Sequence, residues 1–189
     1  VIKKKFKKIL VVLGGDSGER IISLKSGKAC IKALRKKKYT VSAFDPKNKS
    51  LNLINKLKVD AIFNALHGKN GEDGVAQSYF EYLRIPYTHS GIISSYNAMN
   101  KIISKEIFIK SRIPTPKFFF IDKNRVKTEH IKKKLKERKI NFPVVIKPIN
   151  EGSSLGVKIT KNFKELRLSA KTLFKKYNQL IFEQYIGGQ

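Results

Sequence analysis

The chain has little cysteine, few acidic residues and no long apolar run. It contains one cysteine among 189 residues, which excludes an internal disulfide framework and any metal site built from several cysteines. Such usage fits a reducing compartment. No apolar stretch approaches the length that spans a membrane, and the run at residues 9–13 is too short for a signal-peptide core. We therefore expect a cytoplasmic protein without a membrane partner.

The scarcity of acidic residues leaves a large positive charge. There are 41 Lys and Arg against 14 Asp and Glu, a formal net charge of +27. Such an excess would normally suggest nucleic acid as a partner. However, the excess is mostly lysine, is spread along the chain and accompanies Ile, Asn, Phe and Tyr, which all have A/T-rich codons. Genome bias therefore explains the charge as well as function does, and we expect no nucleic-acid partner. A non-enzymatic, polyanion-binding protein remains an alternative that only the charge favours.

Strand-like and helix-like segments alternate over the first part of the chain. The apolar run at residues 9–13 ends in two glycines and is typical of a buried parallel strand. Further strands are expected at residues 40–44, 61–66 and 86–88, and helices at residues 16–35, 51–57, 75–83 and 94–111. This alternation predicts an α/β fold whose N-terminal part is a doubly wound parallel sheet.

Unusual residues follow two of these strands, at residues 14–19 and 67–74. Ligands of parallel sheets collect at the carboxyl ends of the strands, so both segments are candidates for a binding site. Two plainer interpretations stay open at this point. Glu19 is spaced to complete a capping box with Asp16, and a lone histidine such as His67 is often a hydrogen-bonded loop residue.

Two closely spaced prolines, Pro114 and Pro116, stop the helical pattern and predict a domain boundary. The expected domains are therefore residues 1–113 and 114–189. The second should be an α+β domain with hairpin-joined strands. Its strands are expected at residues 118–121, 144–146, 157–159 and 180–186, with helices at residues 128–139 and 163–177. The sequence ends directly after a strand-like segment, so we expect this domain to be incomplete.

A lysine and a small-residue loop lie between two strands of the second domain. Lys147 follows a short apolar run, and residues 152–156 read Gly-Ser-Ser-Leu-Gly. Glycine permits close approach of backbone N–H groups to a phosphate, so the segment could clamp a nucleotide triphosphate. A plain hairpin loop would have a similar composition.

Six motifs in one order then resemble a known family. They are LGGxSxER at residues 13–20, ALHGxxGEDG at 65–74, PYT at 86–88, MxK at 99–101, VxKP at 145–148 and EGSSxGV at 151–157. Together they resemble the D-alanine–D-alanine ligases of the ATP-grasp superfamily. The resemblance covers essentially the whole chain, but only the first domain and most of the central ATP-grasp domain of that family.

The resemblance implies a two-step ligation. ATP phosphorylates the carboxylate of one D-alanine, and the amine of a second D-alanine attacks the D-alanyl phosphate to give the dipeptide, ADP and phosphate. Mg²⁺ or Mn²⁺ would bridge the phosphates. Such a reaction asks the protein mainly for charge neutralisation, positioning and exclusion of water. The product would feed peptidoglycan synthesis, and the family precedent is a homodimer.

The resemblance also implies site residues. Glu19 and Ser153 would act on the first D-alanine, with His67 near its carboxylate. The residues expected to bind ATP are Lys101, Lys147, Glu151, Gly152, Ser153, Ser154, Gly156, Glu183, Gln184 and Ile186, the last three as an adenine hinge. Without the family, Lys101 would be read as a solvated side chain and Glu183 as one buried acid in a strand. We read Glu72 and Asp73 as loop-shaping residues rather than as metal ligands.

The sequence also departs from the family pattern. Asn100 stands where an aspartate often precedes the lysine, His89 replaces a usual glycine, and Gln184 replaces a common lysine. The ribose-binding acid, the transition-state arginine and the magnesium ligands would all lie beyond Gln189, so we assign no metal ligand and expect no turnover from the isolated chain. A ligase that uses D-lactate or D-serine as second substrate, or another ATP-grasp carboxylate–amine ligase, remains the enzymatic alternative.

Overall fold

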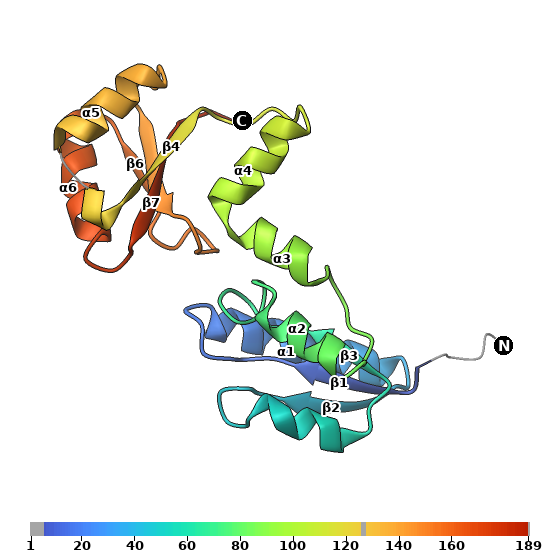
Figure 1. Ribbon diagram of the computed structural model, residues 1–189. Helices are drawn as coiled ribbons and strands as arrows, with labels where there is room; N and C mark the ends of the chain where they lie inside the picture. The colour runs from blue at the N-terminus through green and yellow to red at the C-terminus, as the bar shows by residue number, and fades with distance from the viewer. Residues whose placement is uncertain (1–5, 126–127, 189) are drawn as a thin grey trace. The chain divides into compact units, whose positions relative to one another are not determined.

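The computed structural model describes residues 6–125 and 128–188 (Figure 1). It divides into two compact units, Val1–Ala98 and Met99–Gln189. In the described part of the chain, no helix combines the length and the apolar character needed to cross a membrane.

The first unit is built on a parallel sheet of three strands in the order β2-β1-β3 (Figure 1). Its elements are β1 (Lys8–Val12), α1 (Arg20–Lys36), β2 (Thr40–Phe44), the 3-10 helix η1 (Leu51–Leu57), β3 (Ala61–Asn64), α2 (Val75–Tyr82) and α3 (Ile92–Met99). The central strand β1 pairs in parallel with both neighbours, so that Ile9 lies opposite both Val41 and Ala61.

Alternate residues of β1 pack into two different cores. Leu10 and Val12 pack with Ile54 of η1 and Phe80 of α2. Ile9, Val11 and Leu13 pack on the opposite face, against apolar side chains of α1. Because successive side chains of a strand point to opposite faces, a continuous apolar run is what a sheet covered on both sides requires. The expected doubly wound parallel sheet is confirmed.

The second unit is built on an antiparallel sheet in the order β4-β7-β5-β6. Its elements are α4 (Lys101–Lys110), β4 (Phe118–Asp122), the 3-10 helix η2 (Lys123–Arg125), α5 (Thr128–Glu137), β5 (Val144–Pro148), β6 (Lys158–Thr160), α6 (Phe163–Leu173) and β7 (Gln179–Gln184). The core beneath α5 and α6 includes Val144 and Ile146 of β5 and Leu180 and Phe182 of β7. In Figure 1, α5 and α6 lie on one side of this sheet and α4 on the other. The expected α+β second domain is confirmed.

Three local expectations need correction. The helix expected at residues 94–111 is two helices, because the Asn100 side chain accepts hydrogen bonds from the backbone of Ile102 and Ile103 and so starts α4 afresh. The strand expected at residues 86–88 is a single bridge between Ile62 and Tyr87. Asp16 does not cap the first helix, which begins at Arg20.

The compact units divide earlier in the chain than the expected domains, at Ala98 rather than after residue 113. The helix α4 lies between the two positions. Its backbone and side chains bond to the second unit: the Lys101 N–H donates to the Ile149 carbonyl, and the Lys105 ammonium donates to Thr115 and Pro116. These bonds group α4 with the antiparallel sheet.

Candidate functional site

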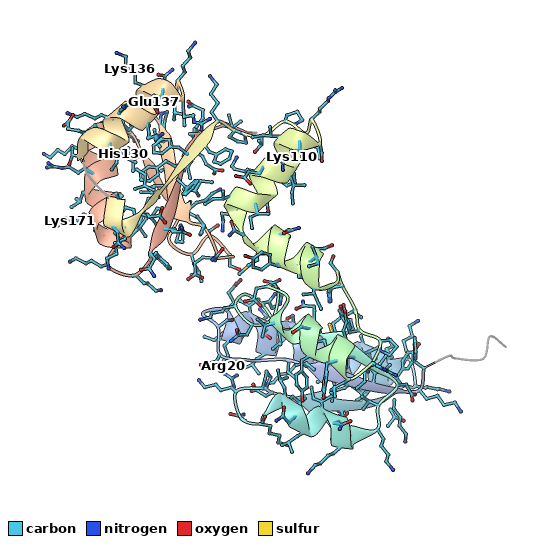
Figure 2. The ribbon with its side chains drawn as sticks, in the orientation of Figure 1. Arg20, Lys110, His130, Lys136, Glu137 and Lys171 are labelled. Carbon is cyan, nitrogen blue, oxygen red and sulfur yellow. The ribbon has the colours of Figure 1, made fainter. Side chains whose placement is uncertain are left out.

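The loop after β1 is held by an ion pair. The Arg20 guanidinium makes two bonds to Asp45, Nη1 to Oδ1 at 3.0 Å and Nη2 to Oδ2 at 2.7 Å, and Nη1 also donates to the Gly15 carbonyl. The bond from Arg20 lowers the pKa of the Asp45 carboxyl, with help from the N–H groups of Lys47 and Gly15. Arg20, labelled in Figure 2, therefore ties the loop after β1 to the end of β2.

Glu19 precedes α1 and is buried, with 7% of its surface exposed. It does not form the capping box considered from the sequence, because it is itself the N-cap and its side chain makes no capping bond. Instead its carboxylate faces the loop after β3: a Cβ built at Gly68 would lie 2.6 Å from Glu19 Oε2. Ser17 joins the same two loops, since its Oγ donates to the His67 carbonyl at 2.6 Å and accepts from the Glu19 N–H at 3.1 Å.

His67 lies in the loop after β3, and both of its ring nitrogens are near polar groups. Nε2 is 3.0 Å from Ser26 Oγ, and Nδ1 is 3.6 Å from Glu72 Oε1. The other oxygen of Glu72 accepts from the Gly68 N–H at 2.6 Å, and Asp73 accepts from the Asn70 N–H at 2.9 Å. Both carboxylates thus shape the loop, as expected. The structure brings Glu19 and His67, two of the expected substrate-binding residues, to adjacent loops of one unit.

Two side-chain amides that the sequence did not single out hold the loop after β3 in place. Asn64 Nδ2 and Gln77 Nε2 both donate to the Gly71 carbonyl at 2.9 Å. Gln77 is 2% exposed, and its Oε1 is buried without a partner. A flipped Gln77 amide would place Oε1 against the Gly71 carbonyl, where two acceptors would meet, so the observed orientation of the amide is fixed. Both amides line a small cavity of about 160 Å³ beside His67. The sequence signal that could have identified Gln77 as buried is its helical spacing with Ala76 and Phe80, which share the buried face of α2.

In the second unit, Lys147 lies near the end of β5 with Glu183 of β7 beside it. Val145 is opposite Glu183 in the antiparallel register, so Lys147 lies two residues along on the same face. Lys147 Nζ is 2.5 Å from Glu183 Oε2, and Lys105 Nζ of α4 is 2.9 Å from Glu183 Oε1. The sequence did not single out Lys105. The three side chains form a charge cluster on the face of the sheet opposite α5 and α6.

Lys101, at the start of α4, binds the backbone that leads into the Gly-Ser loop. Its ammonium donates to the carbonyls of Glu151 and, at 3.4 Å, Ile149. Its expected contact with ATP phosphates stays a prediction. The contacts observed place its charge at the base of the loop at residues 152–156.

The Gly-Ser loop contains three residues in left-handed backbone conformation. Ser153, Ser154 and Gly156 have φ values of 44°, 60° and 73°. Such a conformation costs a non-glycine residue on the order of 1 kcal/mol or more. Gly156 has a further reason to lack a side chain, because a Cβ there would lie 2.8 Å from Pro148.

The expected adenine hinge lies at the end of β7, with Glu183 and Gln184 in the strand and Ile186 after it. Gln184 is engaged with Asn141 through both ends of its amide, Oε1 accepting at 2.9 Å and Nε2 donating at 3.1 Å. Ile186 is 63% exposed. Both carboxylate oxygens of Glu183 face lysine ammonium groups rather than open space. The contact of these residues with a base stays a prediction.

The candidate residues of the two units differ in what they can bind. In the first unit, the buried carboxylate of Glu19 lies next to the backbone of Gly68, which suits a small ammonium-bearing ligand. In the second unit, lysines lie near the loop at residues 152–156, which suits phosphate. Among residues 6–125 and 128–188, no group of three or more His, Cys, Asp or Glu is placed to hold a metal ion.

Sequence comparison identifies relatives along the chain. The family model described as "D-ala D-ala ligase N-terminus" matches residues 45–90, and that described as "D-ala D-ala ligase C-terminus" matches residues 107–189. A curated D-alanine–D-alanine ligase from Pelagibacter ubique is 50% identical over 184 residues, covering 97% of this chain and 59% of the relative.

Solved structures agree with these matches. A D-alanine–D-alanine ligase from Bacillus anthracis in complex with ATP superposes with a TM-score of 0.82 at 36% identity, covering 96% of this chain and 60% of that protein. A D-Ala:D-Ser ligase from Enterococcus faecalis has a TM-score of 0.80 at 27% identity, covering 97% of this chain and 64% of that protein. The fold is thus that of the ATP-grasp ligases.

The chain belongs to the D-alanine–D-alanine ligase family. It spans about three fifths of the length of the relatives it matches.

Proposed function

We propose that this chain supplies the first substrate site and part of the ATP site of an ATP-dependent D-alanine–D-alanine ligase. The observation that carries the proposal is the placement of Lys147 near the end of β5, fixed by Glu183 within the unit that also holds the left-handed serine loop. A lysine held in this way can attract a phosphate without losing side-chain freedom at the moment of binding.

In the nucleotide half of the site, Lys147 and Lys101 would neutralise phosphate charge. The N–H groups of the loop at residues 152–156 would cover the phosphates, with Glu151 orienting the loop. Residues Glu183, Gln184 and Ile186 would face the adenine. Support comes from the loop's positive φ values and from the anchoring of Lys101 at its base.

In the substrate half, Glu19 would hold the ammonium group of the first D-alanine. His67 would lie near the substrate carboxylate, and Ser153 would act on the same substrate. Support comes from the buried carboxylate of Glu19 against Gly68 and from the bonds that fix the His67 loop. These groups would position the carboxylate for attack on the γ-phosphate and hold the resulting D-alanyl phosphate for the second amine.

The described residues do not fit a Mg²⁺ site, so we assign no step to a metal held by them. We infer that ligands for Mg²⁺ or Mn²⁺ follow Gln189 and that the 189-residue chain alone has no ligase turnover. We further propose that the complete enzyme acts in the cytoplasm, in peptidoglycan precursor synthesis, as a homodimer.

The acyl-phosphate step can be tested by isotope transfer. The protein is expressed from its complete reading frame and supplied with ATP and D-alanine labelled with ¹⁸O in its carboxylate. Attack of the carboxylate on the γ-phosphate followed by amine attack on the carbonyl should leave one ¹⁸O in the released phosphate. Phosphate released with D-alanine but without the label would contradict the mechanism.

A second substrate other than D-alanine is kept open by the similarity to the D-Ala:D-Ser ligase. Equal amounts of D-alanine, D-serine and D-lactate in one reaction, with the products separated by mass, distinguish the cases. We expect D-alanyl-D-alanine to dominate, and a dominant mixed product would favour the alternative.

A further inference from the structure

Lys105 of α4 is a buried lysine, with 6% of its surface exposed. Besides its bond to Glu183, its ammonium donates to Thr115 Oγ1 at 2.6 Å and to the Pro116 carbonyl at 3.0 Å. It also lies 4.8 Å from the centre of the Phe118 ring. Taking a lysine out of water is costly unless its charge is compensated, so this set of partners fixes the ammonium in one position.

The Glu183 carboxylate is shared between two ammonium groups. Lys105 lies 2.9 Å from one oxygen and Lys147 lies 2.5 Å from the other. The side chains of Lys105 and Glu183 are 7% and 8% exposed, whereas that of Lys147 is 23% exposed. The cluster of Lys105, Glu183 and Lys147 therefore carries a net charge of about +1, counted from the ordinary charges of the three groups at neutral pH, and Lys147 is the member that reaches solvent.

The second lysine changes what Lys147 can do. A Lys147–Glu183 pair alone would be neutral and would attract an anion weakly. With Lys105 bound to the same carboxylate, the negative charge of Glu183 is already compensated, and the charge of Lys147 is left for a ligand. Lys105 also fixes one oxygen of Glu183, and so directs the other toward Lys147.

We propose that Lys105 is a positioning residue of the nucleotide site: it holds Glu183 in place and leaves the charge of Lys147 available to phosphate. The proposal rests on the proposed function, in which Lys147 binds the phosphates of ATP. Lys105 acts through Glu183 and touches no ligand itself.

The test compares phosphate-bearing and phosphate-free ligands. Affinities for ATP and for adenosine are measured by calorimetry on the protein expressed from its complete reading frame, for the wild type and for Lys105→Met and Lys105→Arg. Lys110→Met is the matched control, because Lys110 is an exposed lysine at the end of the same helix (Figure 2). Melting temperatures are recorded for every variant, and Lys105→Gln replaces Lys105→Met if the latter does not fold.

We expect Lys105→Met to weaken ATP binding about tenfold. Adenosine binding should weaken less, because adenosine lacks the phosphates that Lys147 would bind and depends on Glu183 only through the proposed adenine contact. Lys105→Arg, which keeps the charge, should restore most of the preference for ATP, and Lys110→Met should leave both affinities unchanged. An equal loss for ATP and adenosine, or an unchanged preference for ATP, would overturn the proposal alone. A wild-type protein that binds ATP no better than adenosine would overturn the proposed nucleotide site as well.

Discussion

Replacing Gly68 with alanine tests whether the position of the Glu19 carboxylate depends on its close approach to the loop after β3. Gly68 has φ +70°, and an added Cβ would lie 2.6 Å from Glu19 Oε2. The left-handed conformation alone should cost alanine about 1 to 2 kcal/mol of unfolding free energy. The contact adds to this cost, because Glu19 is buried and must move to relieve it. We expect a total loss of about 2 to 3 kcal/mol and a raised KM for the first D-alanine.

Urea unfolding gives the stability change, and initial rates at varied D-alanine give the KM. Gly91→Ala is the matched control in the same unit, because a Cβ there would meet its nearest atom at 3.6 Å and no left-handed φ is involved. Gly68→Asn separates the two causes, since asparagine tolerates the left-handed region better but still carries a Cβ. If Gly68→Ala matches Gly91→Ala in both stability and KM, the assigned contact between Glu19 and Gly68 is wrong.

Two further predictions follow. Asp45→Asn should lower the unfolding free energy at pH 7 by about 1 to 2 kcal/mol, because it weakens the bidentate bond from Arg20. The pKa of Asp45 is lowered in the folded state, so its contribution is fully present above the ordinary aspartate pKa of about 3.9 and is lost as the pH falls through the folded-state value. The gap between the two unfolding curves should therefore close in acid, and a gap that stays constant down to pH 2 would refute this cause. Lys147→Met should weaken ATP binding at least about tenfold, measured by calorimetry beside Lys158→Met, an exposed lysine on β6 whose loss should change little; equal effects would show that only net charge matters.

The strands of both sheets could be predicted because short, continuous apolar runs are typical of buried strands. Residues 9–13 form a continuous apolar run, and the sheet buries them on both faces. The break at Asn100 could not be foreseen in the same way. Asparagine fits both an exposed helix position and an N-cap, and only the packing of α4 in the second unit decides between them.

The candidate site was predicted unevenly for a similar reason. Glu19 and His67 lie in the loops that follow β1 and β3, where parallel sheets commonly place ligands, and Lys147 lies near the end of β5. The motifs singled out all three residues. Lys105 was missed because one lysine among 41 Lys and Arg carries no signal of its own. Its role depends on the register of β5 and β7, which places Glu183 beside Lys147 and within reach of α4. A pairing of this kind is visible only once the fold is known.

The central claim is that this chain is the substrate-binding and nucleotide-binding part of a D-alanine–D-alanine ligase. The most direct measurement is ADP formation at varied D-alanine, for the protein expressed from its complete reading frame, for its Glu19→Gln variant and for the 189-residue chain. The complete protein should release ADP only with D-alanine and form the dipeptide, the variant should need far more D-alanine, and the 189-residue chain should be inactive. ADP formation by the complete protein that is independent of D-alanine, or no ADP formation at all, would contradict the claim.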